Sequence, residues 1–185
     1  MRSGVRTPLG RVTLRDVRSA DAVAVHGLLL GVLAEGIGFV ATPAEVGDDP
    51  SPSQRAVRSI EGGDGVGVVA QLGPHIVGYA FARPSGPARL SHDAHLEIVL
   101  APRVRGQGLG GVLLDALVDR VRQRPDYLRL SLAVFADNAP AVRLYRSRGF
   151  VEEGRRRGAV RADDGTLRDD LLMVMWVRAG GPESP

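Results

Sequence analysis

The chain contains no cysteine and no lysine among its 185 residues, and all 24 of its basic residues are arginines. The absence of cysteine excludes disulfides, thiolate metal ligands and cysteine nucleophiles. The absence of lysine excludes Schiff-base chemistry and the lysine of a Walker-type phosphate loop. Aromatic residues make up only 4% of the chain, which argues against the base-stacking surface of a nucleic-acid-binding protein.

Long apolar runs are also missing. No stretch reaches the length of a membrane-spanning helix, and residues 1–10 lack the apolar core of a signal peptide. We therefore expect a cytoplasmic protein that does not bind membranes. The 24 arginines alternate with 21 acidic residues along most of the chain, for a net charge of +3, so we expect no nucleic-acid partner.

Length and hydrophobic content suit one globular domain, since 44% of the residues are hydrophobic. We expect a flexible arm over residues 1–10, a single domain over 11–177 and a disordered tail over 178–185. Apolar periodicity predicts strands near residues 12–17, 66–72, 76–82, 94–100, 128–135, 151–157 and 171–177. It predicts helices near residues 21–33, 52–60, 109–121 and 139–148.

The most informative stretch is Arg103-Val104-Arg105-Gly106-Gln107-Gly108-Leu109-Gly110-Gly111, which lies between a predicted strand and a predicted helix. The first N–H groups of a helix are unpaired and carry the positive end of the helix dipole. Glycines at that place let an anion approach the backbone closely. The pattern therefore predicts a phosphate site.

Two kinds of phosphate loop fit these glycines. Gly106, Gly108 and Gly111 satisfy the dinucleotide pattern G-x-G-x-x-G, but residues 101–105 separate it from its strand and too few residues follow for a second nucleotide-binding half. Read as Arg105-x-x-Gly108-x-Gly110, the stretch resembles the acyl-CoA loop of the GNAT N-acyltransferases. A second segment, residues 134–145 followed by Gly149-Phe150, is similar to that family's strand–Asn–helix–Tyr–Gly-Phe segment.

The order and separation of the two motifs make the resemblance strong, and it covers roughly residues 10–177. It implies an α/β fold of the GNAT type, with a mixed, mostly antiparallel sheet of six to seven strands and about four helices. The fourth and fifth strands, here residues 94–100 and 128–135, would splay apart around the pantetheine arm of CoA. The resemblance further implies acetyl-CoA as co-substrate without a metal and a small-molecule amine as acceptor, and it leaves a homodimer open.

The resemblance also implies which residues hold acetyl-CoA, namely the backbone of one strand, the glycine-rich loop and one asparagine. These residues are Ile98, Val99, Leu100, Arg103, Val104, Arg105, Gly106, Gln107, Gly108, Leu109, Gly110 and Asn138. Asn138 would hydrogen-bond the pantetheine arm. It would also cap the helix that follows, a role that by itself needs no ligand.

For catalysis, the resemblance implies that Tyr145 protonates the departing thiolate; the alternative is a core aromatic residue with a surface hydroxyl. Tyr145 follows Asn138 by two helical turns, so both side chains would lie on one helix face. Glu97 is the only carboxylate inside its predicted strand and is the candidate base, with water acting alone as the alternative. Strand alternation puts Glu97 on one face with His95 and Val99.

The acceptor is less defined. Three segments are similar to a GNAT branch that acetylates amino acids and related small amines: residues 89–92, 135–141 and 149–173. Arg83 and Arg89 precede the strand of Glu97, and either guanidinium could bind a carboxylate through two hydrogen bonds. Phe39 would line the acceptor pocket or fill the core. The alternatives are a protein N-terminal, polyamine or antibiotic acetyltransferase, or a non-catalytic module that binds acyl-CoA.

Overall fold

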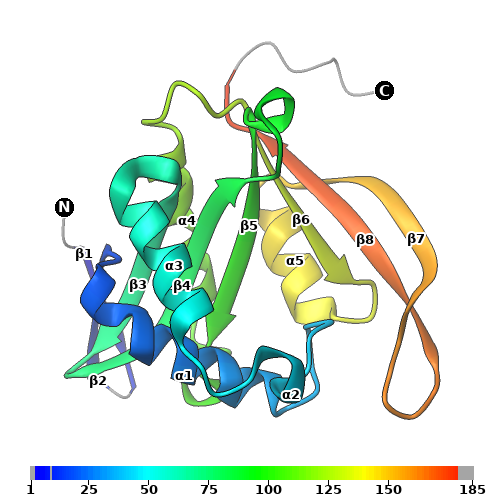
Figure 1. Ribbon diagram of the computed structural model, residues 1–185, viewed down its shortest axis with the longest axis horizontal. Helices are drawn as coiled ribbons and strands as arrows, with labels where there is room; N and C mark the ends of the chain where they lie inside the picture. The colour runs from blue at the N-terminus through cyan, green and yellow to red at the C-terminus, as the bar shows by residue number, and fades with distance from the viewer. Residues whose placement is uncertain (1–2, 9, 179–185) are drawn as a thin grey trace.

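The computed structural model describes residues 3–8 and 10–178, which form an eight-stranded sheet flanked by helices (Figure 1). The strands are β1 (Ser3–Thr7), β2 (Gly10–Asp16), β3 (Val66–Leu72), β4 (His75–Pro84), β5 (Asp93–Leu100), β6 (Arg129–Phe135), β7 (Val151–Arg161) and β8 (Leu167–Trp176). The α-helices are α1 (Ala22–Leu33), α2 (Pro43–Val46), α3 (Ser51–Ser59), α4 (Leu109–Val121) and α5 (Ala139–Ser147). Short 3-10 turns, among them Ala88–Leu90 and Pro102–Val104, precede β5 and α4.

The sheet order is β1-β2-β3-β4-β5-β6-β8-β7, and every neighbouring pair is antiparallel except β5 and β6. These two strands run parallel and pair only over three residues of each, residues 93–95 with residues 129–131. Beyond that point they diverge toward their C-terminal ends, as Figure 1 shows. The splay that the GNAT resemblance implies is therefore present, and within the described residues the facing edges of residues 96–100 and 132–135 have no strand partner.

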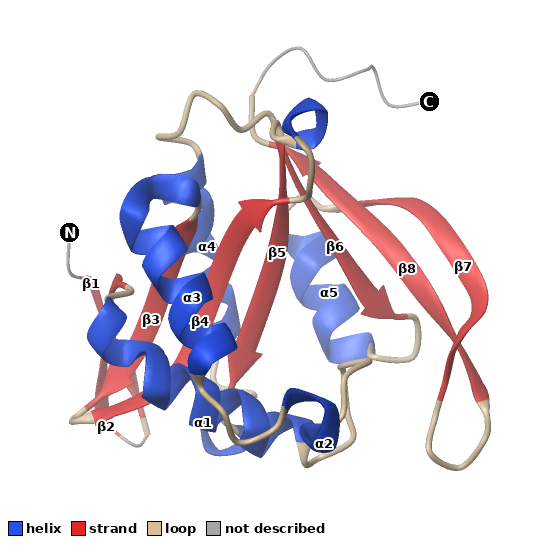
Figure 2. Ribbon diagram, viewed as in Figure 1, coloured by secondary structure: helices blue, strands red, loops and turns tan. Residues whose placement is uncertain are grey.

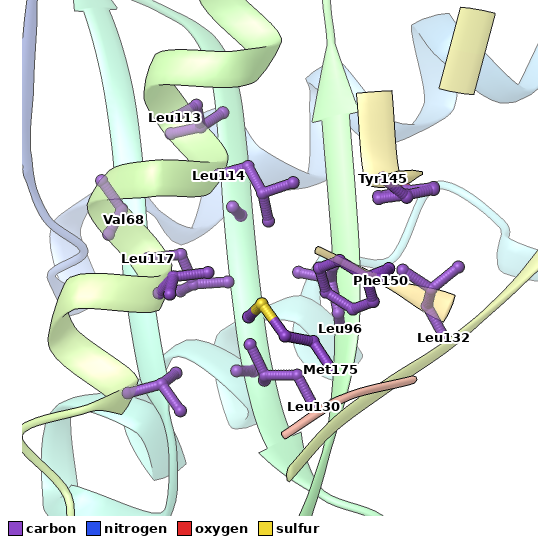
Figure 3. Packing of buried hydrophobic residues seen from close by; sticks show 14 of the residues in the cluster. Val68, Leu96, Leu113, Leu114, Leu117, Leu130, Leu132, Tyr145, Phe150 and Met175 are labelled. Carbon is purple, nitrogen blue, oxygen red and sulfur yellow. The ribbon is translucent and has the colours of Figure 1, made fainter. Parts of the chain in front are cut away.

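Helices cover both faces of the sheet. Helices α1 and α3 lie in front of it in Figure 2, whereas α4 and α5 lie behind it. The larger hydrophobic cluster joins α4 to the back of the sheet through residues such as Leu113, Leu117, Leu96 and Met175 (Figure 3). A second cluster, which includes Tyr79, joins α1 and α3 to the front face. The sheet thus lies between two hydrophobic clusters, one on each face.

The boundaries differ from the sequence prediction in three places. Ser3–Thr7, expected in a flexible arm, form the edge strand β1, which raises the number of strands to eight. This segment carries a single large apolar residue, Val5, so its pairing rests on backbone hydrogen bonds with β2 that periodicity does not reveal. The β7–β8 hairpin is longer than predicted, and α2 is a further helix.

The predicted tail over residues 178–185 lies outside the described residues except for Arg178. The Arg178 guanidinium donates hydrogen bonds to the carbonyl oxygens of Arg122 and Arg124, both at 2.9 Å, and to that of Tyr127 at 3.2 Å. Arg178 therefore closes the end of the domain rather than starting a tail. No helix in the part of the chain that the structure describes is long and apolar enough to cross a membrane.

Candidate active site

The loop between β5 and α4 presents a row of free backbone donors. Gly106 and Gly108 have left-handed φ angles of 71° and 78°, and Gly108 is the N-cap residue of α4. Within the described residues, the backbone N–H groups of residues 106–110 donate no hydrogen bond to protein atoms. Five adjacent N–H groups at the positive end of a 13-residue helix form a concave site suited to an anion.

Gly111 has a different reason for being glycine. A Cβ atom at Gly111 would lie 2.2 Å from Nη2 of Arg148, so the guanidinium occupies the space of that missing side chain. Arg148 in turn donates hydrogen bonds to Asp115 on α4, from Nε at 3.0 Å and from Nη2 at 3.4 Å. The pattern of glycines therefore combines a left-handed turn at Gly108 with space at Gly111 that the end of the Arg148 side chain fills.

The two arginines of the loop are not equivalent. Arg105 donates from Nε to the carbonyl oxygen of Leu100 at 3.0 Å and from its two terminal nitrogens to both carboxylate oxygens of Glu35. Arg103 is exposed, and its side chain forms no ion pair with the described residues; its carbonyl oxygen accepts a hydrogen bond from Gln107. Arg103 is therefore the freer cation beside the anion site, whereas Arg105 ties the loop to the end of α1.

Glu97 lies on the front face of the sheet. Antiparallel pairing places Phe81 opposite Glu97 and Arg83 opposite His95, so these four side chains share one face. The hydroxyl of Tyr79 donates a hydrogen bond to Oε1 of Glu97 at 2.5 Å. The alternation predicted for β5 is correct, and the paired strand now identifies the face, which the sequence did not.

A pocket of about 320 Å³ opens on this face and is lined by Arg83, Pro84, Ser85, His95 and Glu97. It brings together the candidate base and one of the two candidate carboxylate-binding arginines. Arg83 is exposed, and no acidic side chain among residues 3–8 and 10–178 forms an ion pair with it. The pocket therefore holds an unpaired cation and a carboxylate on adjacent strands.

The other candidate acceptor residues lie elsewhere. Arg89 sits in the turn Ala88–Leu90 and does not line this pocket. Phe39 is half-buried and packs against the hydrophobic cluster beneath α1 and α3. A larger hollow of about 640 Å³ beside the β7–β8 hairpin contains ion pairs that neutralise one another, Arg168 with Asp137 and Arg155 with Asp169. Both arginines that line it are thus paired, and its remaining carboxylate, Asp164, accepts hydrogen bonds from Thr166, so among the described residues the hollow offers no unpaired cation.

Tyr145 and Asn138 lie on α5, behind the splay. Tyr145 is 7% exposed, and its ring centroid lies 5.6 Å from that of Phe150. Both residues are labelled in Figure 3. Burial raises the pKa of the Tyr145 hydroxyl above its usual value, so the group is protonated at neutral pH. In the described part of the chain the hydroxyl has no hydrogen-bond partner, which leaves it available to a ligand.

Asn138 caps α5, because its side-chain oxygen accepts a hydrogen bond from the backbone N–H of Ala141 at 3.3 Å. Its side-chain nitrogen faces Gly38, where an added Cβ would lie 3.3 Å away. The loop that follows α1 thus approaches the foot of α5, as Figure 1 also shows. This contact was not predictable from the sequence, since 100 residues separate the two positions.

The described residues hold no cluster of three or more His, Asp or Glu side chains that could bind a metal ion. The anion site, the open strand edges, Glu97 and Tyr145 instead surround the splay between β5 and β6 from different elements. Such an arrangement can bind an extended phosphate-bearing molecule and present two proton-transfer groups to it.

Comparison with known proteins assigns the arrangement to a family. The model of the Acetyltransferase (GNAT) family matches residues 40–150, which include β5, the glycine-rich loop and α5. The N-alpha-acetyltransferase RimI of Mycobacterium tuberculosis is 36% identical over 129 residues, which cover 68% of this chain and 78% of that protein. The L-amino acid N-acetyltransferase AaaT of Escherichia coli is 30% identical over 87 residues, 47% of this chain and 54% of that protein.

A solved structure has the same fold. The GNAT superfamily phosphinothricin acetyltransferase from Sinorhizobium meliloti, determined in complex with AcCoA, superposes with a TM-score of 0.80 at 23% identity and covers 94% of this chain and 92% of its own. Because the family model spans the loop, the splayed strands and α5, the match falls on the elements that form the candidate site. The chain therefore belongs to the acetyltransferase (GNAT) family.

Proposed function

We propose that the protein transfers an acetyl group from acetyl-CoA to the primary amine of a small molecule that carries a carboxylate, such as an amino acid or a close analogue. The observation that carries this proposal is the pocket in which Arg83 and Glu97 lie on one face of β4 and β5. An amino acid is a zwitterion, so its carboxylate would bind Arg83 while its amine faces Glu97. The opposite charges of the pocket complement the opposite charges of the acceptor.

The chain offers acetyl-CoA a fitting site. The five free N–H groups of residues 106–110 would bind the pyrophosphate, with Arg103 adding positive charge. The open edge of β5 at Ile98 and Val99 would bind the amides of the pantetheine arm as a strand would, and Asn138 would bind the same arm from α5. Leu100 fits less well, because its carbonyl oxygen already accepts a hydrogen bond from Arg105.

Two residues, Glu97 and Tyr145, would transfer protons in this reaction. Glu97 would accept the proton of the acceptor ammonium, directly or through water, so that the neutral amine can attack the thioester carbonyl within a ternary complex. Tyr145 would donate a proton to the departing thiolate. Burial keeps this hydroxyl protonated at neutral pH, which is the form that can donate a proton.

A second acceptor class has a specific observation in its favour. The relative from M. tuberculosis is named an N-alpha-acetyltransferase, and the chain covers 78% of it. A peptide N-terminus would present its amine to Glu97 in the same way, but its first residue has no free carboxylate for Arg83. The two classes therefore predict different effects of substitution at Arg83.

The deciding experiment measures thiol release from acetyl-CoA with three matched acceptors: an amino acid, its decarboxylated amine and a short peptide that begins with the same residue. The proposal predicts the highest kcat/KM for the amino acid. Arg83→Gln should raise the KM for the amino acid about 10-fold or more and leave the decarboxylated amine unchanged. Arg89→Gln removes the same charge from outside the pocket and serves as the matched control. Faster turnover of the peptide, unaffected by Arg83→Gln, would contradict the proposal and favour a protein acceptor.

A further inference from the structure

Tyr79 lies in the middle of β4, on the face of the sheet that α1 and α3 cover. It is 1% exposed, and its ring centroid lies 4.5 Å from that of Phe81. Its hydroxyl forms one hydrogen bond within the described residues, the donation to Oε1 of Glu97 at 2.5 Å. An otherwise apolar cluster therefore contains one polar atom, and that atom contacts the candidate base.

The backbone sets this contact. In the β4–β5 ladder, Tyr79 pairs with Val99 and Phe81 pairs with Glu97, so Tyr79 and Glu97 are diagonal neighbours on one face. An aromatic side chain can span this diagonal. Because both residues belong to central strands rather than to loops, the hydroxyl and the carboxylate are held in a constant relation by the sheet.

The direction of the hydrogen bond is also defined. Burial raises the pKa of Tyr79 well above its usual range, and the negative charge of Glu97 raises it further, so the hydroxyl keeps its proton and Glu97 accepts. The second carboxylate oxygen, Oε2, has no hydrogen-bond partner in residues 3–8 and 10–178, and Glu97 lines the 320 Å³ pocket. One oxygen is thus anchored while the other is free to receive a proton.

We propose that Tyr79 is a positioning residue that holds the Glu97 carboxylate in a single orientation toward the acceptor pocket. This inference rests on the proposed role of Glu97 as base. Tyr79 itself is sealed beneath α1 and α3 and does not line the pocket.

The test is Tyr79→Phe, which removes the hydroxyl and keeps the ring. We expect kcat to fall about 10-fold, because a carboxylate free to rotate spends less time in the productive orientation. The KM for acetyl-CoA should stay unchanged.

Two controls separate positioning from packing. Val69→Ala removes a buried neighbour that pairs with Tyr79 on β3, so it should lower the melting temperature without the 10-fold loss of kcat. In a Glu97→Gln background, Tyr79→Phe should have no further effect on kcat, because the hydroxyl would act only through the carboxylate.

The outcomes distinguish the inference from the proposed function. If Glu97→Gln lowers kcat but Tyr79→Phe keeps the wild-type rate, the positioning role is overturned and the base role stands. If Glu97→Gln itself retains the wild-type rate and pH profile, both are overturned. A loss of rate in Tyr79→Phe that adds fully to that of Glu97→Gln would also overturn positioning, because it would show that the two residues act independently.

Discussion

The guanidinium of Arg105 donates two hydrogen bonds to the carboxylate of Glu35, Nη1 to Oε2 at 2.5 Å and Nη2 to Oε1 at 2.9 Å. Its Nε also donates to the carbonyl oxygen of Leu100. One side chain therefore connects the end of β5, the glycine-rich loop and the residue just beyond α1. The arginine that the family pattern associates with phosphate binding has an internal partner that orders the loop.

Glu35→Gln should loosen this loop with little effect on global stability. The pair is partly exposed, so its loss costs under about 1 kcal/mol of unfolding free energy. Amide hydrogen exchange of residues 101–108 should become faster, and the Kd for CoA should rise about 3-fold because the loop must be ordered on binding. Asp119→Asn, an exposed α4 substitution that removes the same charge, is the control. Identical exchange in wild type and Glu35→Gln would contradict an ordering role.

Gly108→Asp should abolish most CoA affinity, because its carboxylate would face the free N–H groups where the pyrophosphate is proposed to bind. An added Cβ at Gly108 meets no atom within 4 Å, so the cost to folding comes from the left-handed backbone, about 1 kcal/mol. Gly73→Asp offers a matched control, since Gly73 lies outside the loop, in the β3–β4 turn, and also has a left-handed φ, 57°, with no atom within 4 Å of an added Cβ. Titration calorimetry should show at least a 10-fold rise in Kd for Gly108→Asp alone. Equal affinity of both folded variants would disprove this phosphate site.

Tyr145→Phe should retain CoA affinity and lower kcat by about 10²-fold, the range expected for loss of a general acid. Its melting temperature should hardly change, because the hydroxyl makes no hydrogen bond within the described residues. Tyr127→Phe is the matched control. The Tyr127 hydroxyl is buried and has no hydrogen-bond partner among the described residues, and Tyr127 follows the C-terminal end of α4, whereas the glycine-rich loop precedes its N-terminal end. Removal of that hydroxyl should leave kcat unchanged. An undiminished rate for Tyr145→Phe would assign this tyrosine to packing alone.

Asp21→Asn should destabilise the fold in a pH-dependent way. Burial by itself would raise the pKa of Asp21, but hydrogen bonds from Arg15, both at 2.7 Å, and from the backbone N–H of Arg18 outweigh burial and hold the pKa below its usual value. A lowered pKa in the folded state contributes stability above the unfolded-state value of about 4 and loses it as pH falls through the folded-state value.

Urea unfolding at a series of pH values tests this prediction. Asp21→Asn should lose about 2 kcal/mol at pH 7, and the difference from wild type should shrink below about pH 4. Asp163→Asn, an exposed substitution in the β7–β8 turn, should lose almost nothing at either pH. A loss that stays constant down to pH 2 would mean that packing, and not charge, is what Asp21 contributes.

The parts of the molecule that could be predicted from the sequence are those that depend on the spacing of residues close together in the chain. The spacing of Gly106, Gly108 and Gly110 after an apolar strand predicted the loop and the start of α4, and period-two alternation predicted the shared face of His95, Glu97 and Val99. These signals depend on residues within a few positions of one another. The family motifs added the splay between β5 and β6, which the structure confirms.

What could not be predicted depends on contacts between distant segments. Glu35 binds Arg105, which is 70 residues away in the sequence, and Tyr79 donates a hydrogen bond to Glu97, which is 18 residues away. No local pattern around Glu35 or around Tyr79 indicates these contacts. β1 was missed because its stability comes from a backbone ladder rather than from apolar side chains. Arg83 and Arg89 looked alike in sequence, yet only the register of β4 against β5 places Arg83 beside His95.

Because β5 and β6 pair over only three residues of each strand, the sheet consists of two parts, β1 to β5 and β6 to β8, that are joined by hydrogen bonds at one end. A ligand that bridges the facing edges of β5 and β6 would bind the folded state alone. The free energy of unfolding would therefore rise with ligand concentration, by about 2.7 kcal/mol at 100 times Kd. The rise in melting temperature would then report how tightly each acyl thioester binds between β5 and β6. Candidate acyl donors can therefore be ranked by thermal shift before any acceptor amine has been identified.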